Sequence, residues 1–237
     1  MKKPISLLFL LLALAGLFPT RAPADDLARG LVGWWRFDGN LIDASGNGNN
    51  GTVGAGSAAY AAGKYGQSFN FTGANSVKVP SIPAIFTLST PFSVSFWTKE
   101  STVSANINWQ STNTGNGRGL SIGAGVFRLA DGTNRKQVDT SDWGNGNWNH
   151  ITAVYDGSNS SAGMKIYVNG VDTNATSTSN QTLSGIDHAG DLWIGSRLGI
   201  AAFMMGQIDN VMIFNRALPP SEIKTLHALG SPIGLAP

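Results

Sequence analysis

The chain has 237 residues, of which 42% are hydrophobic and 13% charged, and its formal net charge is +2. It contains no cysteine, which excludes disulfide bridges, zinc–thiolate sites and a lipid-anchored N-terminal cysteine. The low charge and the 30 glycines indicate many strands and tight turns rather than helices. A chain of this length suits one large β domain as well as two small ones.

The first 24 residues have the pattern of a signal peptide. Lys2 and Lys3 precede an apolar stretch at residues 5–18, and Ala22-Pro23-Ala24 resembles a cleavage site. The stretch is shorter than the roughly 20 apolar residues that a membrane-spanning helix needs. We therefore expect a chain that is exported, to the periplasm or the cell exterior, and cleaved near Ala24.

Cleavage would also change the charge of the protein. Loss of Lys2, Lys3 and Arg21 leaves 13 basic against 14 acidic side chains, a formal charge of −1. The remaining Lys and Arg residues form no cluster in the sequence. Nothing in the charge pattern therefore favours nucleic acid or an anionic membrane as a partner.

Short runs of alternating apolar residues, separated by turn residues, predict an antiparallel β-sandwich. In residues 92–97, Phe92, Val94 and Phe96 share one face and Trp97 lies on the other. Residues 164–168 repeat the alternation and lead into Asn169-Gly170, a pair that favours a two-residue hairpin turn. Further strands are expected at 32–37, 67–71, 76–79, 149–155, 192–195 and 206–214, with turns at Asp131-Gly132 and Asp156-Gly157.

Two segments near the end of the chain differ from the others. Residues 208–214 are apolar on both faces apart from Asp209 and Asn210, which predicts a central strand between two covered faces. Outside the leader, only residues 220–229 read as a helix, and Ile223, Leu226 and Leu229 would dock it on the sandwich.

Six motifs and a short C-terminal pattern occur in a fixed order. They are GWWRFDGN at 33–40, DASGNGNNG at 43–51, FSVSFW at 92–97, WNHI at 148–151, IYVNG at 166–170 and GQIDNV at 206–211, followed by Asn215-Arg216-Ala217-Leu218 and Glu222-Ile223. Across residues 31–229 this order resembles the laminin G-like (pentraxin-type) domains of the concanavalin A-like lectin/glucanase superfamily. The resemblance implies an all-β fold, a two-sheet antiparallel jelly-roll sandwich with a short C-terminal helix. The domain would span residues 31–230, between a linker at 25–30 and a tail at 231–237.

Many members of that family carry a calcium ion near the junction of the first and last strands. The resemblance implies Asp38 and Asp209 as ligands, with Asn40 or nearby backbone carbonyls completing the site, and calcium accepts such a set of oxygen ligands. Asp209 is the stronger indication, because a lone carboxylate in an apolar strand needs a compensating partner. The alternative is that Asp38 begins an Asp-Gly-Asn turn and Asp209 caps backbone groups without an ion.

Three motifs imitate other kinds of site. Residues 43–48 match the first half of an EF-hand loop, but its twelfth position is Gly54 instead of the bidentate Glu. Residues 46–51 match a dinucleotide-binding fingerprint, and residues 119–123 match the hydrolase nucleophile elbow, with His188 as a formal partner. Both motifs function only where a strand leads into a helix, and no helix is predicted after either.

Glycosidases and polysaccharide lyases share the superfamily fold, so catalysis has to be considered. Retaining hydrolysis requires two closely placed carboxylates, usually glutamates alternating along one strand. The two glutamates, Glu100 and Glu222, have no acidic residue two or four positions away. Asp139 and Asp142 are three apart, which would put them on opposite faces of a strand. The sequence therefore predicts no enzyme and no catalytic residue.

Trp109 and Trp143 are candidate sugar-binding rings. Trp109 lies between Asn108 and Gln110, and Trp143 lies in a glycine-rich stretch with loop composition. An aromatic ring stacks on the apolar face of a pyranose while neighbouring polar groups bond its hydroxyls. The alternative is that both rings cover sheet edges, as large tryptophans often do.

Polar residues complete the predicted ligand site. Asn108 and Arg118 join the two tryptophans as ligand-binding candidates, and Arg118, Arg128 and Arg135 would suit an acidic sugar. The alternative is that these arginines form a solvated face.

The leading hypothesis is a secreted, non-catalytic binding module that is stabilised by calcium and binds carbohydrate. The second is an adhesive or structural domain that binds an extracellular protein. The third is a glycoside hydrolase or polysaccharide lyase on the same fold.

Overall fold

The computed structural model describes residues 27–80, 82, 85–100, 107–112, 117–187 and 189–231. The expected signal peptide, the start of the linker, His188 and residues 232–237 of the expected tail lie outside these ranges. The expectations made for those segments are therefore not addressed by the structure.

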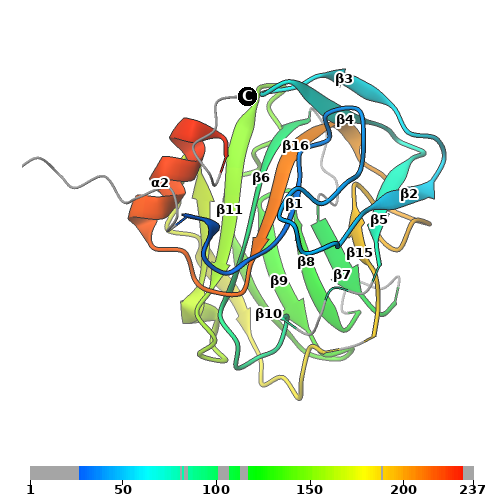
Figure 1. Cartoon of the computed structure of the whole chain (residues 1–237). Helices are drawn as coiled ribbons and strands as arrows, with labels where there is room; N and C mark the ends of the chain where they lie inside the picture. Colours follow the sequence, from blue (N-terminus) through cyan, green and yellow to red (C-terminus); the bar gives the residue numbers. More distant parts are fainter. Residues whose placement is uncertain are drawn as a thin grey trace, which may run out of the picture.

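Within the described residues, two antiparallel sheets of eight strands each are stacked face to face (Figure 1). In order, sheet A contains β13 (Val171–Asp172), β12 (Met164–Val168), β11 (Asn149–Tyr155), β6 (Phe92–Glu100), β16 (Met205–Phe214), β4 (Gln67–Thr72) and β3 (Tyr60–Ala62), with β1 (Leu31–Trp35) paired to β16. Sheet B contains β14 (Thr176–Asn180), β10 (Arg135–Asp139), β9 (Val126–Ala130), β8 (Gly119–Gly123), β7 (Ile107–Gln110), β15 (Leu192–Ile194), β5 (Ser76–Val79) and β2 (Thr52–Ala55). This is the predicted jelly-roll sandwich.

Strand alternation places the hydrophobic core between the two sheets. In β6, Phe92, Val94 and Phe96 are fully buried and point toward sheet B, as their spacing predicts. In sheet B, Ile107 and Trp109 of β7 and Phe127 of β9 point back into the same core. Each buried aromatic ring contributes roughly 150–250 Å² of burial, so this layer supplies most of the driving force for folding.

β16 is a central strand of sheet A, as predicted. It pairs with β6 and β4 and also with β1. Ile208, Val211 and Ile213 face the core, whereas Met212 and Phe214 belong to a second apolar cluster on the outer face of sheet A.

Helix α2 (Pro220–Leu229) covers that outer face and lies at the left of Figure 1. Its Ile223 and Leu226 are fully buried against Trp34 and Met212 in the second cluster. The helix has the predicted limits: a proline occupies its first turn, and Gly230 ends it in the left-handed conformation with φ 68°. Sheet A is therefore covered on both faces over this region.

A cluster of aromatic rings and histidines lies at the contact between α2 and sheet A. Trp97 of β6 stacks on His227 of α2, with 5.4 Å between ring centroids, and His150 of β11 lies 5.7 Å from His227. His150 is fully buried and bonds the Ser95 hydroxyl through Nε2 at 2.8 Å. His150 is therefore part of the contact between the helix and sheet A.

The strands at the sheet edges are short or polar. The predicted Asn169-Gly170 turn joins β12 to the two-residue β13, and both turn residues have positive φ, 51° and 78°. The other edge of sheet A is the three-residue β3, and β14 at an edge of sheet B contains only Thr, Ser and Asn. Short and polar edges limit pairing with other chains.

The buried His150 makes the stability depend on pH. Burial, with a further contribution from His227, lowers the pKa of His150 to about 3, well below the value near 6.5 in an unfolded chain. Between these values the unfolded state binds the additional proton, so stability falls as pH falls from about 6.5 toward 3.

We expect urea-unfolding curves between pH 6.5 and 4.5 to show that the native chain loses on the order of 1 kcal/mol more per pH unit than His150→Phe. The half-exposed His227 provides the matched control, since His227→Phe should retain most of the pH dependence. Parallel pH profiles for the native chain and His150→Phe would contradict this account.

Candidate functional site

The first candidate site lies on the outer face of sheet A, where β16 contains a bulge. The register of β16 against β6 shifts between Asp209 and Met212, and Asn210 has a positive φ of 50°. Because the bulge adds one residue between the core-facing Ile208 and Val211, the side chains of both Asp209 and Asn210 point outward. The Asp209 carboxylate is nevertheless fully buried.

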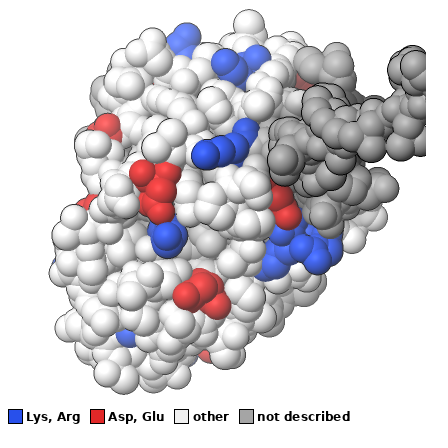
Figure 2. Space-filling model, turned by 90° about the vertical axis from the view of Figure 1, so that its left-hand side faces the viewer, with Lys and Arg blue, Asp and Glu red and all other residues white. Residues whose placement is uncertain are grey.

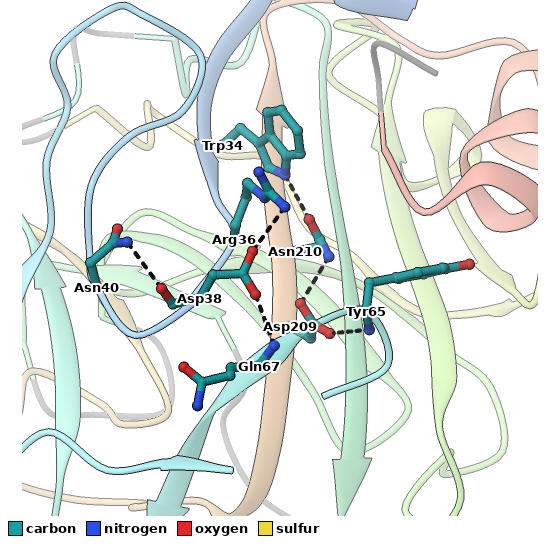
Figure 3. Close-up of polar contacts among 8 residues, drawn as sticks. All are labelled: Trp34, Arg36, Asp38, Asn40, Tyr65, Gln67, Asp209 and Asn210. Carbon is teal, nitrogen blue, oxygen red and sulfur yellow. Dashed lines mark hydrogen bonds and ion pairs between the residues drawn. The ribbon is translucent and has the colours of Figure 1, made fainter. Parts of the chain in front are cut away.

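Backbone N–H groups from the loop between β3 and β4 and from the first residue of β4 bond the carboxylates of Asp209 and Asp38 (Figure 3). The backbone N–H of Tyr65 donates to Asp209 Oδ2 at 2.9 Å, and the N–H of Gln67 donates to Asp38 Oδ1 at 2.8 Å. The loop begins at Gly63, where a Cβ would lie 2.7 Å from Asp209 Oδ2. A side chain at Gly66 would clash with the Asp38 carboxylate. The structure thus brings together the two carboxylates that the resemblance implied as a pair.

The remaining contacts of the two carboxylates are also with N–H donors. Asn210 Nδ2 donates to Asp209 Oδ1 at 2.8 Å, and the same amide accepts a bond from Trp34 Nε1. Asp38 forms an ion pair with Arg36 at 2.9 Å. Burial raises the pKa of Asp209 to about 7, against the backbone N–H bonds that lower it, and the charge of Asp38 raises it further. These bonds therefore leave the buried charge incompletely compensated.

Asn40 takes part in a local turn. Its Nδ2 donates to the Asp38 carbonyl at 3.1 Å and its Oδ1 accepts from the N–H of Ile42 at 3.0 Å. The carboxamide therefore forms the Asp-Gly-Asn turn that was the alternative interpretation. A surface pocket lined by Arg36, Asp38, Asn40, Ile42 and Ala44 opens beside this turn.

The oxygen atoms of Asp38 and Asp209 provide some of the ligands that a calcium ion requires. A carboxylate oxygen has lone-pair capacity beyond one N–H bond, so Asp38 and Asp209 retain acceptor positions. The Arg36–Asp38 ion pair is partly exposed, with 44% and 30% of the two side chains accessible to solvent. Ion pairs this exposed contribute little to folding stability. Calcium needs about six to eight oxygen ligands, so carbonyls and water would have to supply the others. Among the described residues, no group of three or more His, Cys, Asp or Glu side chains could hold a metal ion.

The loop after β1 that imitates an EF-hand is built around Asp43. Its Oδ1 accepts from the N–H groups of Trp34 and Ser45, and its Oδ2 from the N–H of Asn49, each at 2.9 Å. Only 5% of Asp43 is exposed. The carboxylate thus organises the glycine-rich loop through backbone bonds, which explains the motif without an ion.

The two tryptophans predicted to bind sugar are in the core. Trp109 is 2% exposed and donates through Nε1 to the Gly190 carbonyl at 2.9 Å. Trp143 is 3% exposed and donates to Glu100 Oε1 at 3.1 Å. Neither ring presents a face to solvent, so this placement corrects their assignment as stacking rings.

The second candidate site is the outer face of sheet B. Strand registers place five residues in one row across this face, on the strands from β15 to β10: Trp193, Asn108, Ser121, Arg128 and Gln137. Asn108 was predicted, and it donates to the Ser121 hydroxyl at 3.2 Å. Arg118 lies outside the row, where its Nη1 is near Gly185.

Trp193 is the aromatic residue in the row, and sequence reasoning missed it. The ring is partly exposed and packs against Gly54 of β2 and Gly199 of the β15–β16 segment, where any side chain would clash with it. Its neighbours Leu192 and Ile194 are fully buried in the core. Three apolar residues in succession give no alternation in the sequence, so the outward position of Trp193 was not apparent.

The apparent hydrolase elbow lies in a strand, and each glutamate has a structural partner. Residues 119–123 form strand β8, whose two neighbours are β7 and β9, and no helix follows it. Glu100 is buried against Trp143, and Glu222 pairs with Arg216 beside α2. The described strands of sheet B contain one acidic residue, Asp139.

Two stacked antiparallel sheets with paired first and last strands define a β-sandwich domain of the jelly-roll class. A family model described as the concanavalin A-like lectin/glucanases superfamily, in its laminin G form, matches residues 71–224. The chain belongs to this family. Among curated proteins, no match was found. In the described residues, no helix has the length and apolar character needed to cross a membrane.

Solved structures share the fold. Domain 4 of AbnA, a GH43 extracellular arabinanase from Geobacillus stearothermophilus, in complex with arabinotriose, has a TM-score of 0.60 and 20% identity over 83% of this chain and 98% of that one. The binding domain of Paraclostridial Mosquitocidal Protein 1 has a TM-score of 0.67 and 22% identity, covering 85% of this chain and 52% of that one. The binding domain of botulinum neurotoxin DC, in complex with rat synaptotagmin II, has a TM-score of 0.65 and 19% identity, covering 87% and 52%. This chain therefore corresponds to about half of each toxin domain.

The role of Asp43 can be measured. We expect Asp43→Ala to lower the free energy of unfolding by about 2–4 kcal/mol, because three N–H groups lose a largely buried acceptor. Asp142→Ala, at an exposed carboxylate that accepts one bond from Gly144, should cost less than about 1 kcal/mol. Urea unfolding measures both; equal losses in the two variants would contradict this role for Asp43, and a loss seen only when calcium is present would indicate a metal site instead.

Proposed function

We propose that this protein is an exported, non-catalytic module that binds carbohydrate on the outer face of sheet B and is stabilised by calcium on the outer face of sheet A. The observation that carries the binding proposal is the row in which a partly exposed Trp193 lies beside Asn108 and Ser121. A ring for stacking beside amide and hydroxyl groups for bonding is the combination that sugars require.

The position of the row supports the choice of face. Helix α2 occupies the outer face of sheet A, whereas the outer face of sheet B carries polar strand residues. The arabinanase domain with the same fold was solved with arabinotriose, and that observation concerns the other protein. It makes a glycan the first class of ligand to test here.

We propose that the module is not catalytic because of where its carboxylates lie. Retaining glycosidases place two carboxyl groups about 5–5.5 Å apart. Asp139 is the single acidic residue in the described strands of sheet B, and Gln137 Nε2 donates to it at 2.7 Å. A binding role needs no such pair.

A protein ligand is the second candidate. Ile200 and Met205 are 69% and 56% exposed, and both belong to the segment that leads from β15 into β16. Exposed apolar side chains on one segment suit a protein contact. Retention of a partner in the presence of excess sugar would favour this function over glycan binding.

The glycan proposal is tested at Trp193. We expect affinity electrophoresis against a panel of polysaccharides to find a bound glycan, and Trp193→Ala to weaken its binding at least about tenfold, since loss of a stacked ring costs about 1.5 kcal/mol. Trp148→Ala is the matched control, because Trp148 is also partly exposed but lies next to β11 in sheet A. Failure to bind any glycan, or equal losses in the two variants at unchanged melting temperature, would refute the assignment.

The calcium proposal rests on Asp38 and Asp209. A bound divalent ion would supply positive charge to the buried carboxylate and link β16 to the segment after β1. At a hundredfold excess over its Kd, calcium would add about 2.7 kcal/mol, which corresponds to roughly 5–10 °C in melting temperature for a domain of this size.

Thermal melting in calcium and in chelator measures this shift. Asp209→Asn should abolish it, and Asp43→Asn, at another largely buried aspartate, should retain it. An unchanged melting temperature in millimolar calcium would refute the proposal.

A further inference from the structure

Three arginines come together over the outer face of sheet B. Arg128 occupies the centre of β9, Arg135 begins β10, and Arg197 lies in the segment after β15. Burial lowers the pKa of Arg128, and the charges of Arg135 and Arg197 lower it further, whereas Asp139 raises it. Strand register places Arg128 and Arg135 on the same outer face of neighbouring strands, and Arg197 lies two residues before Gly199, which packs on Trp193 of that face.

The segment that carries Arg197 folds over the same face. Gly199 lies against the ring of Trp193, and the segment closes on itself through an N–H bond from Arg197 to the Ala201 carbonyl at 2.8 Å. Beneath it, the outward positions of β8 hold only Gly119, Ser121 and Gly123. By register, Ser121 lies between Asn108 on one side and Arg128 on the other.

Polar atoms at this face lack a protein partner. Asn108 is fully buried, and its Oδ1 accepts no hydrogen bond; the same holds for Oε1 of Gln110, which is 2% exposed. Nε of Arg197 is also buried and makes no bond. Both amides are otherwise ordered, since their nitrogens donate to Ser121 and to the Gly117 carbonyl. Unmatched acceptors and an unmatched guanidinium donor together suit a ligand with both hydroxyl and anionic groups.

We propose that this face selects acidic glycans, with the carboxylate or sulfate group held by Arg197 and Arg128 and the sugar hydroxyls held by Asn108. The proposal rests on the carbohydrate-binding function above and adds the class of sugar. Arg128 is oriented for this role by its Nε bond to Gln137 Oε1 at 2.7 Å. A guanidinium group forms paired bonds with planar carboxylates, which favours arginine over lysine at such a position.

The charge distribution on the rest of the surface indicates that a preference for acidic glycans would come from the outer face of sheet B and not from the whole molecule. On the side of the molecule that carries α2, basic and acidic side chains are few and intermixed among uncharged residues (Figure 2). The full sequence has 16 basic against 14 acidic residues, so the molecule has no strong general attraction for polyanions. The arginine cluster is therefore a local feature.

The test compares matched polymers using the full chain. Polygalacturonate and its methyl ester differ in the carboxylate charge, and a sulfated galactan and its unsulfated form differ in the sulfate. In affinity electrophoresis we expect at least tenfold tighter binding to one acidic polymer than to its neutral counterpart, with a preference that falls as salt rises. The two pairs distinguish carboxylate from sulfate.

Variants assign the preference to the cluster. Arg197→Gln and Arg128→Gln should each remove most of the difference between acidic and neutral polymers, and Arg29→Gln, at an exposed arginine outside sheet B, should not. Melting temperatures identify any variant that fails to fold, and Arg197→Lys, which keeps the charge without paired bonding, should recover only part of the preference.

The outcomes separate this inference from the proposed function. Equal binding of acidic and neutral polymers that depends on Trp193 would overturn the acidic selection and leave glycan binding intact. Absence of binding to every polysaccharide would overturn both. Polyglutamate binding as strong as that of the acidic polysaccharides would show a general polyanion surface and would also overturn the inference.

Discussion

The buried carboxylate of Asp209 constrains the segments around it. A charge with no solvent exposure in a central strand requires donors on all sides, and the structure supplies them from Asn210 in the bulge and from Tyr65 in the β3–β4 loop. The loop can approach only because Gly63 carries no side chain. The N–H of Gln67, at the start of β4, donates to Asp38, so the two carboxylates together hold the segment after β1, the centre of β16 and the start of β4 in place.

Coverage of sheet A determines which surface remains for a ligand. Helix α2 and the rings of Trp97 and His227 cover part of its outer face, and the inner faces of both sheets form the core. The outer face of sheet B has no such helix in the described residues, and its strands carry the polar side chains of Asn108, Ser121 and Arg128. Polar atoms that are buried there without partners are costly to stability, which is why we attribute them to recognition.

The sequence predicted the fold class and most strands of sheet A because strand periodicity and turn chemistry are local. The limits of α2, the hairpin at Asn169-Gly170 and the central position of β16 all agree with the structure. In sheet B only β5 and β15 were among the expected strands, and in sheet A the short β3 and β13 were missed. β3 and β14 contain little apolar periodicity, which is why the sequence did not reveal them. The proximity of Asp38 and Asp209 came from the family resemblance, since no spacing in the chain indicates it.

The ligand-binding residues were harder to predict because a strand has two faces. Asn108 and Gln110 flank Trp109, and these polar neighbours suggested an exposed ring. In a strand, neighbouring residues point in opposite directions, so the same pattern means a buried ring with polar residues on the other face. Trp193 was missed for the opposite reason. Its neighbours Leu192 and Ile194 are apolar and buried, which suggested that Trp193 is buried as well.

The short and polar edge strands have a consequence for how such a module works. A protein that gathers on a repetitive polymer reaches high local concentrations, which normally favour the joining of sheets between neighbouring copies. β13 and β3 offer too few backbone groups for stable strand addition, and the Thr and Ser side chains of β14 give it little apolar surface. With the proposed glycan binding, copies lined up along one polysaccharide chain would therefore have little tendency to join through these three edges, and each could dissociate independently of its neighbours.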